Sequence, residues 1–462
     1  MKWALHRLVG ISWRMCAVAM LGVWSTAASP LVDYQRVLYL TPPPTFNEAD
    51  GLVQCRDGTL LGTLHSRANY GGVLFRVGPD GSGYTALYLS ATNRPSGVIE
   101  GSDGRLYGTI GGDPAASLSG VFSVAADGGN FILLRTSSSP SDRISQFGVV
   151  QDDEGWLFGT TSGDGFQNGG TVFKLATDGT GFRALHEFRG LAAEDGLIPG
   201  ALTVGRDGWL YGCTFFGGSP SNVGTIFRLR TDGSGYAVLH RFGGGRNGRY
   251  PSADQPLLEG SDGFLYGAAD GGINSAGVIF KLNKSGNDYQ VIHEFEGENG
   301  TGESPIGGLV EWCDGALYGA THEGGIDGAG MLFRINKDGS AFAALHTYID
   351  APNPEATEGT PRTRLVPAND GRLYGLTSGG VVAEGTVFRI TPLPSLRIRT
   401  GPEAIVVSWP DCSGRFELEE SNQLGLSDGW TRVDAVGEVI ESVRRVTLPR
   451  NADRRFFRLN SR

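Results

Sequence analysis

The sequence has few of the residues that mark metal, redox or nucleic-acid sites. Its 462 residues include five cysteines, and none of them forms the Cys-x-x-Cys spacing typical of zinc or redox centres. Lysine and arginine total 39 and form no cluster in the repeated part of the chain, and the formal net charge is −10. Because binding to phosphates requires clustered basic side chains, this composition argues against nucleic acid and anionic membranes as partners.

Sequence motifs of common enzymes are also absent. There is no Ser-His-Asp order of a hydrolase, no Gly-Lys-Ser/Thr phosphate loop and no His-Glu-x-x-His zinc motif. Beyond residue 28, no window combines a helical apolar period with capping residues, which excludes helical repeat folds. The sequence therefore identifies no catalytic residue, no cofactor and no metal ligand set.

Residues 1–28 have the features of a secretory signal peptide. Basic residues that include Lys2 and Arg14 precede a short apolar run over residues 15–24, and small residues follow over 25–28. The apolar run is too short for a typical membrane-spanning helix, and an uncleaved anchor is the alternative. Cleavage would remove Lys2, Arg7 and Arg14 and change the net charge from −10 to −13. We expect a secreted protein that resides outside the cell, on the outer cell surface or in the periplasm.

Glycine is abundant, at 73 residues, and it recurs with a period. The phrase Asp-Gly-x-Leu-Tyr-Gly and its close variants occur seven times, at separations of 46, 51, 53, 55, 52 and 56 residues. A period of this size is typical of repeat arrays and propellers. The copies start at Asp57, Asp103, Glu154, Asp207, Asp262, Asp314 and Asp370.

The fourth copy shows how one repeat is built. Short runs rich in β-branched and aromatic residues cover 201–204, 209–212, 225–229 and 236–242, and Asp-Gly or Gly-Gly pairs separate them. Four antiparallel strands per repeat predict the blade of a β-propeller, and seven copies predict seven blades over residues 33–391. We expect the Asp-Gly pair to form a two-residue hairpin turn with both residues at positive φ. Its Asp then has a turn role and not a calcium or catalytic one.

The last copy lacks a fourth strand, because residues 385–390 are followed by Pro392 and Pro394. The N-terminal segment supplies a match, since Val-Leu-Tyr-Leu at 37–40 is similar to Ala-Leu-Tyr-Leu at 86–89, the fourth strand of the first copy. We predict that this segment completes the last blade and closes the ring, which removes a pair of exposed sheet edges.

The repeats resemble a known family. Units such as Leu-Tyr-Gly-Thr, Gly-Thr-Val-Phe and Asp-Gly-Ser-Gly are similar to the tandem GloVer repeats of secreted proteins from Verrucomicrobia and similar bacteria, over residues 38–390. The resemblance implies a repeat fold and a secreted setting, and it implies no catalytic residue.

The period ends after Pro392, and residues 395–462 form a separate module. Five runs alternate apolar with polar residues and predict the strands of a small β-sandwich. The Leu-Glu-x-Ser and Phe-Phe-Arg-Leu runs resemble fibronectin-III-like modules that end many secreted proteins of the same bacteria. The module is either a packing cap for the ring or an attachment or sorting module. The five runs cover 405–409, 415–419, 430–433, 445–448 and 456–459.

The positions of four cysteines and four recurring histidines indicate packing roles. The cysteines occupy unrelated positions of their repeats, where an isolated Cys is usually a small buried side chain, although a disulfide between two of them is the alternative. The histidines share one position of the fourth strand, so the blades point them apart and they cannot gather on one metal ion. The residues are Cys55, Cys213, Cys313 and Cys412, and His186, His240, His293 and His346.

Function is expected in the loops where the copies differ. The usual winding of a propeller places the loops after the second and fourth strands around one mouth of a central channel, and such loops commonly carry recognition. The longest cover 189–199, 243–255, 296–305 and 350–361. Aromatic or charged side chains in these Gly-rich loops are candidate ligand contacts: Phe215, Phe216, Arg246, Arg249, Tyr250, Asp270, Glu323 and Asp327.

Two functions remain open at this point. The preferred one is a secreted or surface-associated binding and scaffold protein whose acidic loop face contacts a protein or a glycan. The alternative is a propeller enzyme, such as a glycoside hydrolase or polysaccharide lyase, which requires paired carboxylates about 5–10 Å apart. The sequence offers acidic residues on several loops and gives no such pair.

Overall fold

The computed structural model describes residues 15–17, 32–40, 48–66, 71–112, 119–137, 143–163, 169–190, 194–218, 220–297, 302–305, 308–349, 359–378, 385–411, 414, 416–422, 429–435, 437–440, 443–450 and 455–461. The chain divides into two compact units. The larger contains residues 34–368 and 372–390, and the smaller contains residues 1–33, 369–371 and 391–462. No helix within the described ranges is long and apolar enough to cross a membrane.

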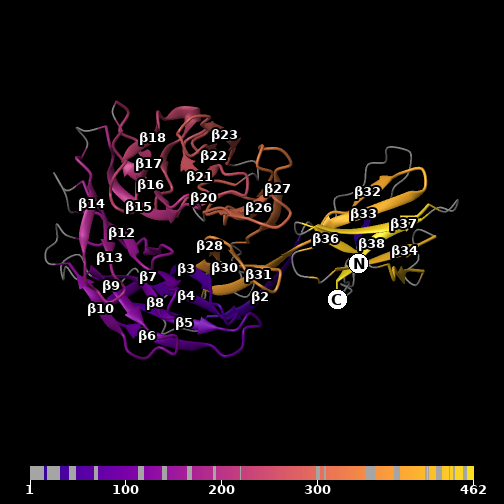
Figure 1. Ribbon diagram of the computed structural model, residues 1–462, viewed down its shortest axis with the longest axis horizontal. Helices are drawn as coiled ribbons and strands as arrows, with labels where there is room; N and C mark the ends of the chain where they lie inside the picture. Colours follow the sequence, from indigo (N-terminus) through magenta and orange to yellow (C-terminus); the bar gives the residue numbers. More distant parts are fainter. Residues whose placement is uncertain are drawn as a thin grey trace, which may run out of the picture. The chain divides into compact units, whose positions relative to one another are not determined.

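The larger unit is an all-β propeller, as the sequence predicts. Its described residues form seven antiparallel sheets that follow one another around a centre, from indigo at β3 through magenta to orange at β31 in Figure 1. In sheet 1 the first strand, β3, contacts β7 of sheet 2 and β30 of sheet 7, which places first strands at the centre of the ring.

The first four sheets each contain four consecutive strands. Sheet 1 contains β3 (Glu48–Gln54), β4 (Leu60–His65), β5 (Gly72–Val77) and β6 (Thr85–Ser90). Sheet 2 contains β7 (Asn93–Glu100), β8 (Leu106–Gly112), β9 (Ser119–Val124) and β10 (Ile132–Thr136). Sheet 3 contains β11 (Val150–Gln151), β12 (Leu157–Thr161), β13 (Thr171–Leu175) and β14 (Arg183–Glu187). Sheet 4 contains β15 (Leu197–Val204), β16 (Trp209–Phe216), β17 (Thr225–Arg230) and β18 (Ala237–Arg241).

The last three sheets vary this plan. Sheet 5 follows the short 3₁₀ helix η3 (Gly245–Asn247). Its first strand is split into β19 (Arg249–Pro251) and β20 (Leu258–Glu259). The remaining strands of sheet 5 are β21 (Leu265–Asp270), β22 (Val278–Leu282) and β23 (Gln290–Glu294). Sheet 6 contains β24 (Val310–Glu311), β25 (Leu317–Thr321), β26 (Met331–Ile335) and β27 (Ala343–Thr347). Sheet 7 contains β28 (Thr360–Pro361), β29 (Val366–Pro367), β30 (Leu373–Ser378) and β31 (Thr386–Pro392).

The N-terminal segment completes sheet 7, which confirms the predicted closure. Strand β2 (Val32–Tyr39) is the outermost strand of that sheet and pairs with β31. The Leu40 N–H then donates to the Gly385 carbonyl at 2.9 Å, as the Phe188 N–H donates to the Gly170 carbonyl at 2.9 Å after the fourth strand of sheet 3. Closure leaves the ring without a free pair of sheet edges at this seam.

The hydrophobic core lies between neighbouring sheets. At the seam, Leu40, Tyr374 and Val387 pack with Leu64 and Phe75 of sheet 1 in one buried cluster. Equivalent clusters join the sheets in order, for example sheets 4 and 5 and sheets 5 and 6. Burial of this apolar surface, and not the turns, stabilises the ring.

The Asp-Gly turn differs from the prediction. At the first copy the Gly58 N–H donates to the Cys55 carbonyl, and the Cys55 N–H donates to the Thr59 carbonyl, which defines a three-residue loop. Only Gly58 has positive φ, at 87°, and the Asp57 carboxylate instead accepts from the Thr59 N–H at 3.0 Å. The turn is therefore of the type in which a type I turn is followed by a left-handed Gly, and Asp is favoured because its side chain closes the loop.

The repeated Asp has a second role that joins it to the repeated Tyr. The Tyr hydroxyl, four positions later, donates to the other oxygen of the carboxylate: Tyr107 to Asp103 at 2.7 Å, and Tyr211 to Asp207 at 2.8 Å. Both rings are buried. The Asp satisfies the polar end of a buried ring, which is why Asp and Tyr recur together.

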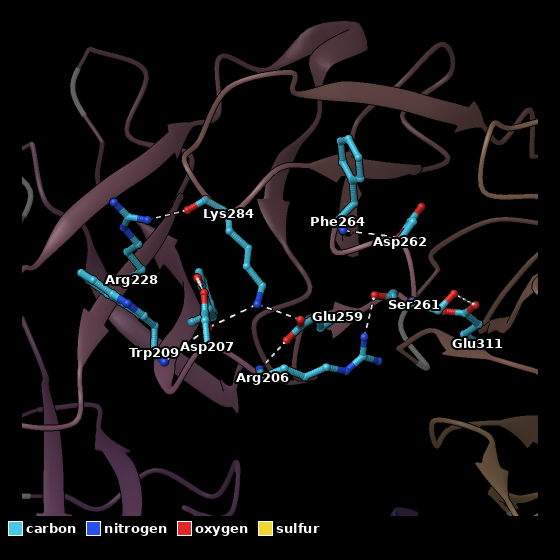
Figure 2. A network of polar contacts seen from close by, with 12 residues as sticks. Arg206, Asp207, Trp209, Arg228, Glu259, Ser261, Asp262, Phe264, Lys284 and Glu311 are labelled. Carbon is cyan, nitrogen blue, oxygen red and sulfur yellow. Dashed lines mark hydrogen bonds and ion pairs between the residues drawn. The ribbon is translucent and has the colours of Figure 1, made fainter.

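Polar contacts also connect the turns of adjacent sheets, as Figure 2 shows for sheets 4 and 5. The Lys284 ammonium pairs with the Asp207 carboxylate at 3.2 Å and with the Glu259 carboxylate at 2.7 Å. Glu259 also accepts from the Arg206 N–H at 2.8 Å. The same arrangement recurs between sheets 5 and 6, where the Lys337 ammonium of sheet 6 pairs with Asp262 of sheet 5 at 3.7 Å and with Glu311 at 2.6 Å. Because these groups satisfy one another and recur with the repeat, they hold the ring together and are not a ligand site.

The smaller unit contains two four-stranded sheets. One contains β32 (Arg397–Thr400), β33 (Ala404–Pro410), β37 (Val443–Pro449) and β36 (Glu438–Ile440). The other contains β35 (Thr431–Arg432), β34 (Phe416–Ser421), β38 (Phe456–Ser461) and β1 (Met15–Ala17). One buried cluster, which includes Trp409 and Phe457, has members in both sheets, as in a sandwich. All five predicted strands are present, and β32 and β36 were missed because they are short and exposed.

Strand β1 lies inside the segment that the sequence predicts as a signal peptide and pairs with β38. The remainder of residues 1–28 lies outside the described residues, and the signal peptide stays a prediction.

The cysteines divide into two groups. Cys55 and Cys213 are buried free thiols, in agreement with the packing role expected for them. Cys313 is disulfide-bonded, so the same expectation was wrong for this residue. Cys412 lies outside the described residues.

Candidate functional site

The first strands approach one another closely at the centre of the ring. A Cβ atom on Gly97 of sheet 2 would lie 2.2 Å from the Cα atom of Gly148 in sheet 3, so only glycine fits there. Side chains from different sheets can therefore meet at the centre wherever the chain supplies something larger than glycine.

Sheet 5 departs from the other sheets at this inner edge. Pro251 and Glu259 pair with Ala269 and Leu265 of its second strand, as Pro95 and Glu100 of sheet 2 pair with Ile110 and Leu106. The two positions are eight residues apart in sheet 5 and five residues apart in sheet 2. Compared with sheet 2, three extra residues therefore form a bulge between β19 and β20.

The bulge is held against sheet 4. The Ala253 carbonyl accepts from the Ala201 N–H at 2.6 Å, and a Cβ atom on Gly200 would lie 1.8 Å from the same carbonyl oxygen. The bulge also carries Asp254 and Gln255, which no other first strand matches. Close backbone packing thus fixes the position of an acidic residue beside the centre of the ring.

Three carboxylates interact around this bulge. Burial, followed by the nearby carboxylates of Asp50 and Asp270, raises the pKa of Asp254 to about 6. Burial also raises the pKa of Asp50 of sheet 1, although the nearby His65 opposes the shift. Burial raises the pKa of Asp270 as well, against the opposing effect of Arg249. Asp254 can therefore gain or lose a proton close to neutral pH.

Four of the eight predicted contacts lie close together, and one of them is the Asp270 carboxylate. The Phe216 and Tyr250 rings form an edge-to-face pair, with centroids 5.6 Å apart and an interplanar angle of 70°. They are 39% and 36% exposed. The Arg249 guanidinium lies 5.9 Å from the centroid of the Tyr250 ring, and Arg249 is the register partner of Asp270. An exposed aromatic pair, a cation and a carboxylate thus form one surface.

The backbone of Tyr250 has a positive φ of 46°, which is uncommon for an aromatic residue. Ile198 and Ser304 also have positive φ, and each of them precedes a proline, as Tyr250 does. The N–H of each of the three residues donates to a carbonyl in a loop of the preceding sheet, which for Tyr250 is the Val223 carbonyl. The strain therefore belongs to the repeat. Only the side chain differs, and in sheet 5 it is the exposed aromatic ring.

The other four predicted contacts have different surroundings. Phe215 packs in the core between sheets 4 and 5 and contacts the Phe147 ring of sheet 3 at 5.6 Å. Arg246 is exposed and pairs with Glu294 at 3.0 Å. Glu323 lies 3.6 Å from His322 in sheet 6, and Asp327 is exposed on the following loop.

Three of the predicted loops are partly strand, and the loop 350–361 ends in β28 (Thr360–Pro361). Residues 197–199 belong to β15 and residues 249–251 belong to β19, because each pairs with the end of the second strand of its sheet. Parts of the loops 189–199, 296–305 and 350–361 lie outside the described residues.

The recurring histidines pack between sheets, as expected from their placement. His186 stacks on Tyr236 of the next sheet, with ring centroids 3.5 Å apart, and His240 stacks on Tyr289 at 3.7 Å. Burial lowers the pKa of His240 and of His293 to about 4, so both are neutral near pH 7. Across the part of the chain that the structure describes, no three His, Cys, Asp or Glu side chains are grouped to hold a metal ion.

Sequence reasoning missed Asp50 and Asp254. Asp50 follows Glu48 in β3, Asp254 lies in the bulge between β19 and β20, and neither residue belongs to a recognisable motif. The one available signal was the longer spacing between Pro251 and Glu259, which a comparison of the copies reveals.

The fold and the repeated phrase define the class of this protein as a tandem-repeat β-propeller. The sequence matches the Gloeobacter/Verrucomicrobia repeat family over residues 30–219 and again over residues 191–388. The chain therefore belongs to this family. No protein of curated function matches the sequence.

Solved structures of similar fold serve diverse purposes. Streptogramin B lyase is 15% identical with a TM-score of 0.53, over 79% of this chain and 99% of that one. The extracellular domain of a hybrid two-component system from B. thetaiotaomicron is 12% identical with a TM-score of 0.51, over 94% and 59%. PorZ, a surface component of the type-IX secretion system of Porphyromonas gingivalis, is 11% identical with a TM-score of 0.51, over 87% and 59%. At these identities the likeness establishes the fold and leaves function to the site.

Proposed function

We propose that the protein is an extracellular or cell-surface binding protein that holds a glycan on the loop face of sheets 4 and 5. The observation that carries this proposal is the exposed Phe216 and Tyr250 pair beside Arg249 and Asp270. Sugars present C–H faces, which pack on aromatic rings, and hydroxyl groups, which donate to carboxylates. A surface that combines both groups on a rigid scaffold suits such a ligand.

A glycan is favoured over a protein partner by the mixed chemistry of this surface. Large protein interfaces bury an extensive patch with an apolar centre. Here the exposed rings of Phe216 and Tyr250 lie directly beside charged groups. The acidic balance of the chain, at −10, also disfavours anionic polymers in general.

The test is a binding screen of full-length protein against a glycan array, with a panel of secreted proteins as the second arm. We expect a glycan signal that falls at least tenfold in the Phe216→Ala, Tyr250→Ala double variant. Tyr39→Ala is the matched control, because Tyr39 is 53% exposed on the outer strand β2. Binding to proteins alone, or equal loss in the control, would contradict the proposal.

A second function, glycan cleavage, is favoured by one observation. Burial, with a contribution from the charge of Asp50, raises the pKa of Asp254 to about 6, which suits a group that transfers protons. Each glycan that binds is therefore also assayed for hydrolysis and for lyase products. If the protein is an enzyme, Asp254→Asn will abolish turnover and leave binding within about threefold of wild type, because the aromatic pair is unchanged.

The extracellular location rests on the predicted signal peptide over residues 1–28. Fractionation of cells that express the full chain tests it directly. We expect a mature N-terminus after residue 27 or 28 in the medium or on the cell surface. Recovery of the uncleaved chain in the cytoplasm would contradict this location.

A further inference from the structure

One arginine stands at the centre of the ring where the other copies have small or cyclic residues. Arg364 lies between β28 and β29 on the first strand of sheet 7 and immediately precedes the buried Leu365. The residues that precede the matching apolar position in the other copies are Gly51, Gly97, Gly148, Ala201, Pro256 and Gly308.

The Arg364 side chain extends across sheet 6 toward sheet 5. Its Cδ and Cγ atoms lie 3.1 and 3.2 Å from the place that a Cβ atom on Gly308 would occupy. The Cβ atom of Gln255 lies 3.3 Å from the same place. Glycine at position 308 thus allows the arginine from sheet 7 and the glutamine of the sheet 5 bulge to approach each other.

The guanidinium group of Arg364 has no hydrogen bond or ion pair with any residue that the structure describes. Other arginines with limited exposure are paired, for example Arg334 with Asp314 at 2.8 Å and Arg458 with Glu419 at 2.6 Å. Burial alone lowers the pKa of Arg364, with no contribution from a carboxylate. The acidic group around Asp254 does not neutralise it.

An unpaired, half-buried guanidinium in such a place favours a counter-charge. Taking a charged group out of water is costly unless a partner compensates, and arginine cannot escape the cost by losing its proton. The described part of the chain supplies no partner, and no guanidinium nitrogen of Arg364 is among the fully buried atoms without a partner, so an anion from solution can reach the group. The planar fork of a guanidinium matches a carboxylate, with two parallel hydrogen bonds.

We propose that Arg364, together with the side-chain amide of Gln255, binds a carboxylate group at the centre of the ring. The ligand is either a small free organic acid or the carboxylate of an acidic sugar. Glycine at position 308 lets the stems of these two side chains lie close together, which brings their polar ends to the same part of the ring. This site is separate from the aromatic surface of Phe216 and Tyr250, and it does not depend on the glycan proposal.

The test measures thermal unfolding of the full-length protein in acetate, in glucuronate and in chloride at equal ionic strength. We expect a rise of about 2 °C or more for wild type in acetate or glucuronate relative to chloride. The rise disappears in Arg364→Gln. In the same experiment Arg397→Gln, an exposed arginine on β32, keeps the rise of the wild type.

Each outcome decides the proposal. A rise in both acetate and glucuronate supports a site for free carboxylates, and a rise in glucuronate alone supports a site for acidic sugars. An equal rise in Arg364→Gln, or no rise in either salt, overturns the proposal. Should Arg364→Gln fail to fold, Arg364→Lys keeps the charge without the planar fork and must show a reduced rise. Because Arg364→Gln removes an unpaired charge, we also expect it to melt above wild type in chloride.

Discussion

The imidazole ring of His346 stacks on the phenol ring of Tyr34, with centroids 3.7 Å apart and an interplanar angle of 5°. Tyr34 belongs to β2 near the N-terminus and His346 to β27 of sheet 6, so this contact joins the start of the propeller to its penultimate sheet. It is the same contact that His186 makes with Tyr236 between sheets 3 and 4. The N-terminal strand therefore packs as an ordinary fourth strand.

Loss of the Tyr34 ring should open the seam of the ring. We expect Tyr34→Ala to lower the free energy of unfolding by about 2–3 kcal/mol, because it removes a partly buried aromatic side chain and its stack. Deletion through Leu40 should lower the melting temperature further, since it removes the whole strand. Denaturant unfolding measures both. A deletion variant with the wild-type melting temperature would show that β2 does not close the ring.

The buried histidines should make the protein less stable as the pH is lowered. The pKa values of His240 and His293 are lowered to about 4 in the folded chain, so the unfolded chain binds more protons between pH 6.5 and 4. Stability is lost as the pH falls through this window. After a discount for partial exposure, we expect about 2 kcal/mol for each residue. Urea unfolding at pH 7 and 4.5 measures the loss, and the His240→Gln, His293→Gln double variant should show a smaller one.

Asp254 should have the opposite effect on stability. Its pKa is raised to about 6, so the folded chain binds more protons than the unfolded chain between pH 3.8 and 6. The ionised group destabilises the fold above that window. We expect Asp254→Asn to raise the free energy of unfolding by about 2–3 kcal/mol at pH 8 and by little at pH 4. A pH-independent change would indicate that Asp254 acts through packing alone.

Gly200 should determine the position of the sheet 5 bulge. A Cβ atom there would lie 1.8 Å from the Ala253 carbonyl oxygen, so Gly200→Ala must displace backbone. We expect a loss of about 2 kcal/mol or more in stability and a weakening of any ligand contact that involves Asp254. Gly243→Ala is the control, because no atom lies within 4 Å of its added Cβ and its φ is not in the left-handed region. Equal behaviour of the two variants would disprove the role of Gly200.

The fold could be predicted from the sequence because its determinants are local and repeated. The Asp-Gly-x-Leu-Tyr-Gly phrase marks one hairpin in each copy, and Val37 to Leu40 matches the fourth strand of sheet 1 closely enough to reveal the closure. The turn type was wrong because Asp-Gly occurs in both two-residue and three-residue hairpins. The second role of Asp, toward the Tyr hydroxyl, depends on side-chain direction within the hairpin and is not visible in the pattern.

The candidate site could be predicted only in part. Phe216, Arg249, Tyr250 and Asp270 were identified as unusual loop residues, and they do meet. The sequence did not identify Asp50, Asp254 and Arg364. These residues come from sheets 1, 5 and 7, and they lie at the centre only after the ring has formed. Contacts between distant copies depend on the curvature of the whole array, which no single repeat encodes.

Closure by β2 has a consequence for how the chain folds during synthesis. Residues 32–39 leave the ribosome before every other strand of the ring, yet their partner β31 spans Thr386–Pro392. The first strand made is therefore the last to be paired, and loop closure over this separation is slow relative to hairpin formation. Until then, the nascent chain exposes one unpaired strand and one open sheet edge. A chaperone that binds extended segments would find its target at the N-terminal end of this protein.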